Sequence, residues 1–363
     1  MAKYIDAEEI RLNYDPERPQ QRFKDAGLAA AFEPLSERLP TTVPWPAGKA
    51  PKGVPLNPAP KESDDLTRFK GYDAIVITWT SAEAATLAAL MSPGFPVSSW
   101  YEYRHNIDQY IPLVTGARAP FNDKEPDMAR YFHSLGLYFP CQIGKAKVLL
   151  MKSGLHLDYD GPKTPLKNLV GDLINAVKPK LFITTGTGGG IGTEVKLGDV
   201  IVAGETHFHC AQQFKNEPWA AASYKTSPLP HGTIAAITPD LTKVNAAKVV
   251  GGREVPKIWS GANDKIVTTD FFAFDDSTNY YKLEGLGQAC DMGDAMIGQA
   301  LQAFPDVQWH AIRNASDPQI PNPTNDIKAA DKQSGEIYTK YGAFTTAASV
   351  IATWAVIISK FGV

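Results

Sequence analysis

The stretch Ile183–Gly192 reads ITTGTGGGIG and joins a strand-like segment to a run of glycines. The apolar and β-branched residues at its start are typical of a strand that is buried on both faces. Glycine after a strand lets a ligand approach the backbone at the carboxyl edge of a sheet. The stretch has neither the G-x-G-x-x-G spacing of a dinucleotide site nor the lysine of a P-loop. It predicts a strand followed by a glycine turn near a ligand, with a simple tight turn as the alternative.

Strand-like and helix-like segments alternate on both sides of this stretch. Short apolar β-branched runs predict strands, and longer stretches with helical periodicity predict helices. The predicted strands are Ala74–Trp79, Lys147–Lys152, Leu181–Thr185, Asp199–Ala203, Lys265–Thr269 and Val307–Arg313. The predicted helices follow Thr80, fill Pro165–Val177, run through Met292–Ala303 and close the chain. This alternation predicts an α/β sandwich.

Composition and charge narrow the classes of function. The 363 residues carry a formal net charge of −3, which gives no general attraction for nucleic acid or an anionic membrane surface. Neither is expected as a partner. Three widely spaced cysteines, Cys141, Cys210 and Cys290, form neither a disulfide framework nor a paired-thiolate zinc site. The first residues include acids where a signal peptide needs an apolar core, so a cytoplasmic protein is expected.

One uncharged segment, Gly342–Ser359, has about the minimum length of a membrane-spanning helix. Its apolar residues, among them Ala347, Ile351, Trp354 and Ile358, recur at helical spacing, while threonines and serines fill the other face. The pattern predicts a packed C-terminal helix rather than a membrane span.

Two regions fall outside the strand and helix pattern. Residues 1–70 are rich in proline, which predicts an arm that wraps on the body or on a neighbouring subunit. Residues 71–363 are expected to form a single catalytic domain. Within it, residues 92–139 are interpreted as an insertion, whose many aromatic side chains suggest a lid or an interface.

Two acidic residues from distant parts of the sequence each follow a predicted strand. Glu83 closes the segment Thr80-Ser81-Ala82-Glu83, and Asp317 follows Ser316 soon after the strand that ends at Arg313. Because α/β active sites assemble at the carboxyl ends of strands, the pair suits a general acid and a general base. The alternatives are a capping box for Glu83 and an Asx turn for Asp317.

The segment His207-Phe208-His209-Cys210 invites a metal interpretation, because two histidines two residues apart on an extended chain point the same way. No further ligand cluster lies near them in the sequence, so neither a metal nor another cofactor is expected. The markers of acyl transfer, a G-x-S-x-G elbow or an S-x-x-K motif, are missing.

Several segments, in the same order, resemble the nucleoside phosphorylase superfamily, and within it the 5′-methylthioadenosine/S-adenosylhomocysteine nucleosidases more than the phosphorylases. The most specific is the glycine stretch followed by Lys196-Leu197-Gly198-Asp199-Val200. The likeness covers roughly residues 72–92 and 145–358. It implies a three-layer α/β sandwich around a central mixed, mostly parallel twisted sheet. It also implies a homo-oligomer, a dimer or a hexamer, without a cofactor.

The resemblance also implies a set of site residues. In the nucleosidases a glutamate, a serine and an arginine hold the attacking water, and an aspartate protonates the leaving purine. The matching positions here are Glu83, Ser153 in Lys152-Ser153-Gly154-Leu155, Arg313, and Asp317. The implied substrate contacts are Phe272 on the purine, Met292, His209, Ser316, and Gly188 and Gly189 of the glycine run. Protonating the base while holding a nucleophile at the sugar is what cleavage of an N-glycosidic bond requires.

One position departs from the superfamily pattern. Asp291-Met292-Gly293-Asp294 stands where the superfamily has Glu-Met-Glu, whose second glutamate holds both ribose hydroxyls. Gly293 has no carboxylate. Either Asp294 reaches in from the next position, or the ribose clamp is missing, which would favour a deoxy, modified or bulky sugar.

These residues predict hydrolysis of a purine nucleoside or a nucleoside-like small molecule, with Asp317 as the acid and Glu83 activating water. Glu83 and Thr184 stand near places where phosphorylases carry phosphate-binding arginines, so water is favoured as the nucleophile. The first alternative is a phosphorylase that uses Arg104, Arg118 or Arg130 of the insertion or of a neighbour. The second is a catalytically inactive nucleoside-binding protein.

Overall fold

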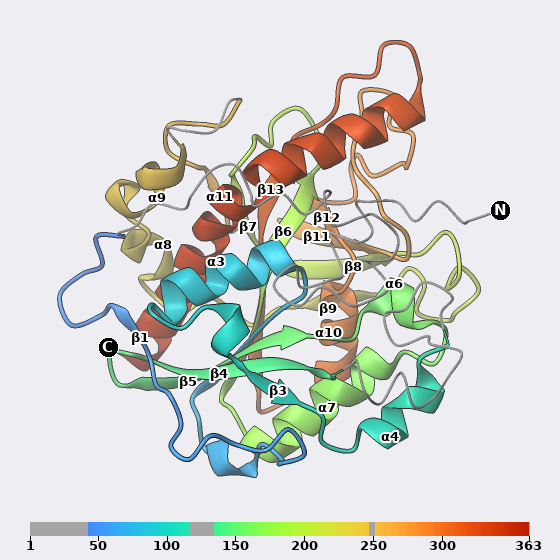
Figure 1. Ribbon diagram of the computed structural model, residues 1–363. Coiled ribbons are helices and arrows are strands. Elements are labelled where there is room, and N and C mark those ends of the chain that lie inside the picture. Colours follow the sequence, from blue (N-terminus) through green and yellow to red (C-terminus); the bar gives the residue numbers. More distant parts are fainter. Residues whose placement is uncertain (1–42, 116–133, 247–250, 363) are drawn as a thin grey trace, which may run out of the picture.

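A mixed β-sheet forms the centre of the fold (Figure 1). The computed structural model describes residues 43–115, 134–246 and 251–362, and in these residues the sheet has 13 strands. The main order is β1-β4-β5-β2-β6-β12-β11-β8-β9; β3 lies beside β4, β13 beside β6, β7 beside β13, and β10 beside β7. The strands are β1 (Pro51–Gly53), β2 (Ala74–Thr78), β3 (Tyr101–Tyr103), β4 (Gly136–Ile143), β5 (Ala146–Ser153), β6 (Leu181–Gly190), β7 (Val200–Val202), β8 (Glu205–His209), β9 (Ser223–Lys225), β10 (Ile258–Trp259), β11 (Lys265–Thr269), β12 (Ala289–Asp291) and β13 (Gln308–Asp317).

The central strands of this sheet are parallel. β2 pairs with β5 and β6, β6 pairs with β13, and β11 pairs with β12 and β8, all in parallel. Antiparallel pairs join β4 to β5, β7 to β13 and β12 to β6. Parallel strands bring their carboxyl ends to a common edge, where the residues that follow them meet. The mixed, mostly parallel sheet implied by the resemblance is confirmed.

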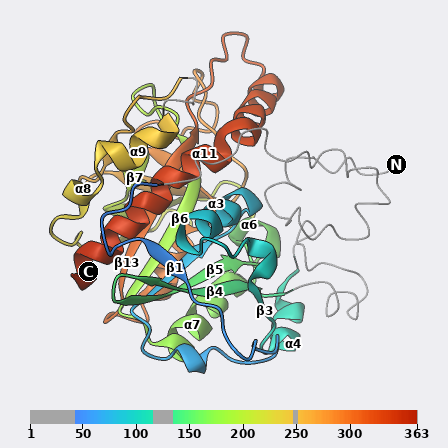
Figure 2. The ribbon, with the colours of Figure 1, turned by 60° about the vertical axis from the view of Figure 1, so that its left-hand side comes forward.

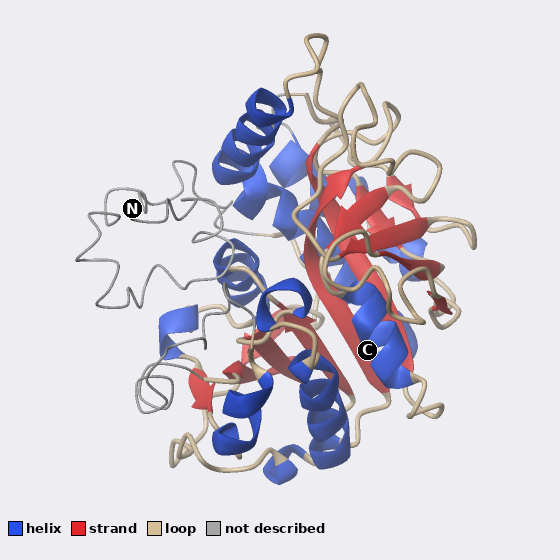
Figure 3. Ribbon diagram, turned by 90° about the vertical axis from the view of Figure 1, so that its right-hand side faces the viewer, coloured by secondary structure: helices blue, strands red, loops and turns tan. Residues whose placement is uncertain are grey.

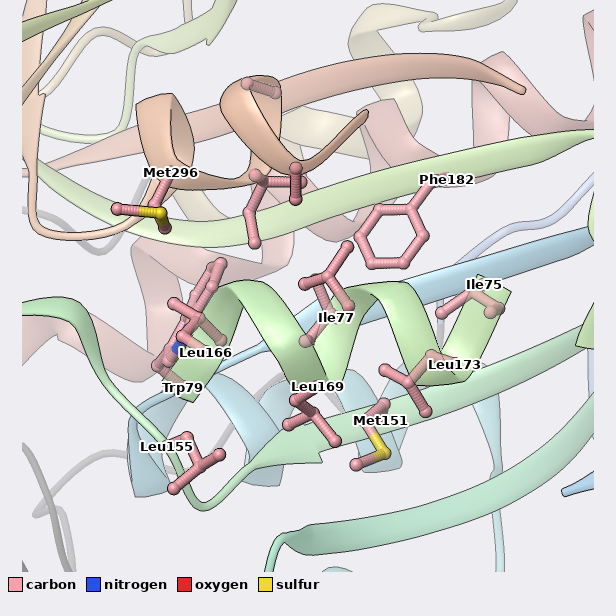
Figure 4. Close-up of a cluster of buried hydrophobic side chains, with 14 of the residues drawn as sticks. Ile75, Ile77, Trp79, Met151, Leu155, Leu166, Leu169, Leu173, Phe182 and Met296 are labelled. Carbon is pink, nitrogen blue, oxygen red and sulfur yellow. The ribbon is translucent and has the colours of Figure 1, made fainter. Parts of the chain in front are cut away.

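Helices cover both faces of the sheet (Figure 3). Successive side chains of a strand point to opposite faces, so β2 contributes to two cores. Ile75 and Ile77 pack with Leu169 of α7 on one face (Figure 4). Ala74 and Val76 face the other core, where α3 and α11 lie side by side (Figure 2). The α-helices are α3 (Ser81–Met91), α4 (Ile107–Tyr110), α6 (Leu157–Asp160), α7 (Pro165–Val177), α8 (Thr233–Ala236), α9 (Pro239–Ala246), α10 (Asp294–Leu301) and α11 (Ile327–Phe361). The predicted three-layer sandwich is therefore confirmed.

β6 continues through the glycine run, where the sequence predicted a turn. It pairs with β13 as far as Gly189, so the glycine backbone stays in the sheet. Gly186 has a φ of +155°, and a side chain there would overlap the carboxylate of Glu83. A Cβ on Gly188 would lie 2.8 Å from the carbonyl oxygen of Cys290 on β12. The glycines thus permit the close approach of other elements, and both turn interpretations of this run are wrong.

Two elements extend further than predicted. β13 does not end at Arg313 but runs to Asp317. α11 begins at Ile327 rather than at Gly342, because Asp326 caps it by accepting hydrogen bonds from two backbone N–H groups of its first turn. The apolar part of this helix is 83% buried inside the protein, as expected of a packed core helix.

The described part of the predicted arm, residues 43–70, lies against the body of the protein. The rings of Trp45 and Trp354 have centroids 5.0 Å apart, and Nε1 of Trp354 donates a hydrogen bond of 2.7 Å to the carbonyl of Lys49. β1 pairs with β4 at the edge of the sheet. Residues 1–42 lie outside the described residues, so the arm as a whole stays a prediction.

The predicted insertion supplies core residues in its described part. Trp100, Tyr103 and Tyr110 are buried in the two cores of the same molecule. Trp100 also stacks on Phe139 of β4. These three side chains pack inward on the sheet, and the lid or interface expected of the insertion stays a prediction. The remaining part, residues 116–133, lies outside the described residues.

His310 on β13 is a buried group that the sequence did not single out as special. Its side chain has no exposed surface, and neither ring nitrogen has a hydrogen-bond partner among the described residues. Burial, and to a smaller degree the nearby Lys360, lowers the pKa of His310 to about 4. The folded protein therefore holds this imidazole neutral.

A pH-dependent stability follows from this lowered pKa. An unfolded histidine titrates near pH 6.5, so His310 stabilises the fold fully above that pH and loses the contribution as the pH falls toward 4. We expect His310 alone to lower the free energy of unfolding by about 2 kcal/mol between pH 7 and pH 5. Urea unfolding at both pH values should show a smaller pH dependence in His310→Leu. His231→Gln, at an exposed histidine, is the control. Equal pH dependence in His310→Leu and the parent would contradict the expectation.

Candidate active site

A cavity opens where the carboxyl ends of β2, β6 and β13 meet the segments that follow β11 and β12. Its lining combines aromatic side chains with a few polar and charged groups, as is typical of sites for small molecules. Eight of the predicted site residues line it: Glu83, Gly188, Gly189, Phe272, Met292, Arg313, Ser316 and Asp317. The two acids that the sequence placed at distant strand ends therefore share one cavity.

A buried arginine organises one side of the cavity. Arg313 Nε and Nη2 donate to the two carboxylate oxygens of Asp294 at 2.8 and 2.6 Å. Nη2 also lies 3.2 Å from Asp291 Oδ2, and Nη1 lies 3.4 Å from Glu83 Oε1. The guanidinium carbon is 4.9 Å from the ring centroid of Trp79. One cation thus fixes three buried carboxylates, which leaves the group with an excess of negative charge when all are ionised.

Glu83 is held by more hydrogen bonds than the other acids. Oε2 accepts from the hydroxyl of Thr78 (2.7 Å) and the N–H groups of Trp79 (3.0 Å) and Thr80 (2.9 Å), and Oε1 accepts from the N–H (2.6 Å) and hydroxyl (2.8 Å) of Thr187 and from Arg313 (3.4 Å). The capping box that the sequence offered as an alternative is confirmed, with Thr80 accepting in return from the N–H of Glu83. Burial alone would raise the pKa of Glu83, but Arg313 and the N–H donors outweigh it and lower the pKa.

Asp291 is a site residue that the sequence analysis did not select. It ends β12, lines the cavity and is buried. Burial and the neighbouring Asp294 raise the pKa of Asp291 to about 7, against the opposing charge of Arg313. Its Oδ2 accepts from the N–H groups of Gly293 and Asp294, whereas Oδ1 accepts from the hydroxyl of Thr268 at 2.6 Å. Asp291 begins the Asp-Met-Gly-Asp segment, in which the departure from the superfamily pattern pointed only to Gly293 and Asp294.

Asp317 lies at the end of β13, on another part of the cavity wall. The hydroxyl of Ser316 donates to Oδ1 at 2.8 Å, and the hydroxyl of Ser334 on α11 donates to Oδ2 at 3.0 Å. Burial raises the pKa of Asp317 to about 6, although both hydroxyl donors favour the ionised form. A carboxyl with this pKa is partly protonated near neutral pH and can act as a general acid.

Three predicted site residues do not line the cavity. The hydroxyl of Ser153 donates to the carbonyl of Leu155 at 2.8 Å and accepts from its N–H at 3.1 Å, so it holds its own turn. Asp294 is fully buried behind Arg313 and is engaged by it. His209 lies on β8 with Nε2 3.2 Å from the carbonyl oxygen of Tyr281. None of the three side chains lines the cavity, although Asp294 contacts Arg313, which does.

Gly293 lies against an indole rather than beside open space. A Cβ on Gly293 would be 3.2 Å from Cζ2 of Trp79, and both residues line the cavity. A larger side chain at this position would have to displace the ring. Because Arg313 binds both carboxylate oxygens of Asp294, Asp294 does not reach in as the first branch of the sequence expectation required, and the geometry agrees with the second branch, a missing carboxylate at this position.

Two further contributors come from α11, the helix whose start the sequence placed too late. Ser334 contacts Asp317 as described, and Tyr338 lines the cavity with its hydroxyl 2.9 Å from Oγ1 of Thr80. In the described ranges, no group of three or more His, Cys, Asp or Glu side chains could hold a metal ion. A helix signal at Asp326 could have pointed to these residues, because Asp is a preferred N-cap.

Comparison with known proteins shows which family this chain is similar to. A family model described as the Phosphorylase superfamily matches residues 118–341. A 5′-methylthioadenosine/S-adenosylhomocysteine nucleosidase of Shewanella sediminis is 31% identical over 148 residues, which are 40% of this chain and 60% of that relative, less than two thirds of its length. The enzyme of the same name from Shewanella pealeana is 28% identical over 206 residues, 53% of this chain and 82% of the relative.

Among solved structures, a Helicobacter pylori 5′-methylthioadenosine/S-adenosylhomocysteine nucleosidase covers 79% of this chain and 99% of its own, with 15% identity and a TM-score of 0.49. A futalosine hydrolase of the same organism covers 79% of this chain and 97% of its own, with 14% identity and a TM-score of 0.49. Because the family model extends over more than half of the residues, this chain belongs to the phosphorylase superfamily.

Proposed function

We propose that this protein is a nucleosidase that hydrolyses the N-glycosidic bond of a purine nucleoside or a nucleoside-like compound. The observation that carries the proposal is one cavity lined by Asp317, whose burial raises its pKa, and by Glu83 and Asp291, which both contact Arg313. Relatives that bear the name of nucleosidases support the reaction class. The homo-oligomer and the cytoplasmic location stay predictions from the sequence.

The leaving base needs a proton, and Asp317 is the proposed donor. Cleavage of the bond puts negative charge on the purine, which protonation of a ring nitrogen neutralises. The raised pKa of Asp317, about 6, leaves a fraction of the carboxyl protonated at neutral pH. Phe272 lines the same cavity and offers an aromatic face on which the base can stack.

The sugar side needs negative charge and an acceptor for the proton of water. As the bond breaks, the sugar becomes cationic, and the carboxylates around Arg313 stabilise that charge. Glu83 is a weak base, because six hydrogen bonds hold it ionised. Asp291 has the higher pKa and a single hydrogen bond on Oδ1, so we propose it as the proton acceptor, with Glu83 as a fixed charge.

The same charges support water over phosphate as the nucleophile. The nitrogens of Arg313 already contact three carboxylates, and their excess negative charge would repel a phosphate dianion. Of the arginines considered for a phosphorylase, Arg104 lies within 4 Å of the carboxylates of Glu62 and Glu102. Arg118 and Arg130 lie outside the described residues.

The first test is an assay of a nucleoside panel in phosphate-free buffer, with chromatography of the released base. We expect turnover without phosphate, and a kcat/KM that falls about tenfold per pH unit well above the pKa of Asp317. Asp317→Asn should lower kcat by at least roughly 100-fold, since it cannot donate this proton, while purine binding persists. Turnover that requires phosphate would favour the phosphorylase. A panel with binding but no turnover would favour the inactive binding protein.

The second test separates the two candidate proton acceptors. If Asp291 accepts the proton, activity should also fall at acidic pH, where Asp291 is protonated, and Asp291→Asn should remove this acidic limb. Asparagine retains an oxygen for the N–H donors at Oδ2, so the fold should persist. Glu83→Gln is the comparison variant. An acidic limb that survives in Asp291→Asn would contradict the assignment.

The third test concerns the sugar. Because Gly293 lies against Trp79 and Asp294 is engaged by Arg313, the ribose diol has no dedicated carboxylate at this position. A site built around a hydroxyl rejects the deoxy analogue by about 10⁴-fold, so we expect kcat/KM values of 2′-deoxy and ribonucleosides within about tenfold of each other. A preference for ribonucleosides far beyond tenfold would contradict the expectation.

A further inference from the structure

The first half of α11 crosses the carboxyl ends of β6 and β13 beside the cavity (Figure 1). Two of its residues, Ser334 and Tyr338, are one helical turn apart and therefore lie on the same side of the helix. Ser334 donates to Oδ2 of Asp317, and the hydroxyl of Tyr338 lies 2.9 Å from that of Thr80. One turn of helix thus contacts both the end of β13 and the start of α3.

This turn is held in place from both sides. Upstream of it, Ile327 and Ala330 pack with Phe274 and Ile320. Downstream, Tyr341 and Phe344 pack with Leu197 in a separate cluster. Ser334 itself is buried. The hydroxyl that contacts Asp317 therefore comes from an anchored helix and not from a loop.

We infer that Ser334 is a positioning residue for the proton donor Asp317, and that its hydroxyl fixes the carboxyl toward the leaving base and tunes its proton affinity. This inference rests on the proposed function. The groups that face Asp317 are Ser316 on its own strand, Cys290 on β12, Asp275 after β11, and Ser334 and Tyr338 on α11.

The chemistry of the step explains why a hydroxyl is useful here. Before the step the proton is on the Asp317 carboxyl; during the step it moves to a ring nitrogen of the base as the N-glycosidic electron pair passes to the base. The carboxylate left behind is the better hydrogen-bond acceptor, so the bond from Ser334 strengthens as the proton departs. A donor that strengthens in the transition state lowers the barrier.

Tyr338 extends the same arrangement to the second carboxylate. Its hydroxyl contacts Thr80, whose Oγ1 accepts from the N–H of Glu83. The turn that positions Asp317 therefore also contacts the capping box around Glu83. A shift of α11 would move both contacts together, since Ser334 and Tyr338 belong to one rigid turn.

The experiment measures pH profiles of kcat for the full chain, with Ser334→Ala as the test variant. Without the hydroxyl the ionised carboxylate loses a donor, so the pKa of Asp317 should rise and the alkaline limb should move up by about one pH unit. The plateau of kcat should fall roughly fivefold, because a weaker acid transfers its proton less readily. Ser334→Thr keeps a hydroxyl and should restore the parent limb.

Ser349→Ala is the matched control. Ser349 is a buried serine of the same helix, and its hydroxyl accepts a hydrogen bond of 2.8 Å from the side-chain amide of Asn314 on β13, away from the cavity wall. Ser349→Ala should change the stability of the fold without moving the alkaline limb of the kcat profile. A second readout is the pH dependence of adenine affinity by calorimetry, whose midpoint should move upward in Ser334→Ala as well.

The outcomes separate this inference from the proposed function. The inference is supported if the alkaline limb of the kcat profile and the midpoint of the pH dependence of adenine affinity both move in Ser334→Ala. Neither should move in Ser349→Ala. If Asp317→Asn is inactive while Ser334→Ala keeps the parent limb and midpoint, the inference is overturned and the nucleosidase proposal stands. If Asp317→Asn turns over at the parent rate, the acid assignment fails and the role of Ser334 fails with it.

Discussion

The buried guanidinium of Arg313 is the interaction on which the site depends. From β13 it contacts Glu83, which follows β2, and Asp291 and Asp294 at and just after the end of β12, and its guanidinium lies over the indole of Trp79. A single positive charge among three carboxylates does not neutralise them, so their pKa values diverge: that of Glu83 is lowered and that of Asp291 is raised. Different proton affinities in one cluster are what acid–base chemistry needs.

The sequence predicted the sandwich well, because hydrophobic periodicity and β-branched runs decide which segments form strands and helices. α7 has the predicted bounds, and β11 does as well. The glycine run was predicted poorly. Its conformation depends on Glu83 and β12, which approach from elsewhere in the chain. The local sequence therefore cannot predict it.

The site was predicted in part for a similar reason. The strand ends brought Glu83, Arg313 and Asp317 to one cavity, since topology alone places them at a common edge. Ser153 and Asp294 could not be placed from spacing, because their contacts with Leu155 and Arg313 depend on side-chain geometry. Ser334 and Tyr338 were missed because their helix begins in a charged segment without a clear apolar face.

The wall that β6 contributes is made of backbone at Gly188 and Gly189. This backbone is hydrogen-bonded to β13 on one side and to β12 on the other, and it has no side-chain rotamers that could change. The surface therefore has the same rigid shape for every ligand. Discrimination between ligands must then come from lining side chains such as Phe272, Met292 and Trp79. Substrate preference can therefore diverge among relatives by exchange of those side chains while the sheet stays unaltered.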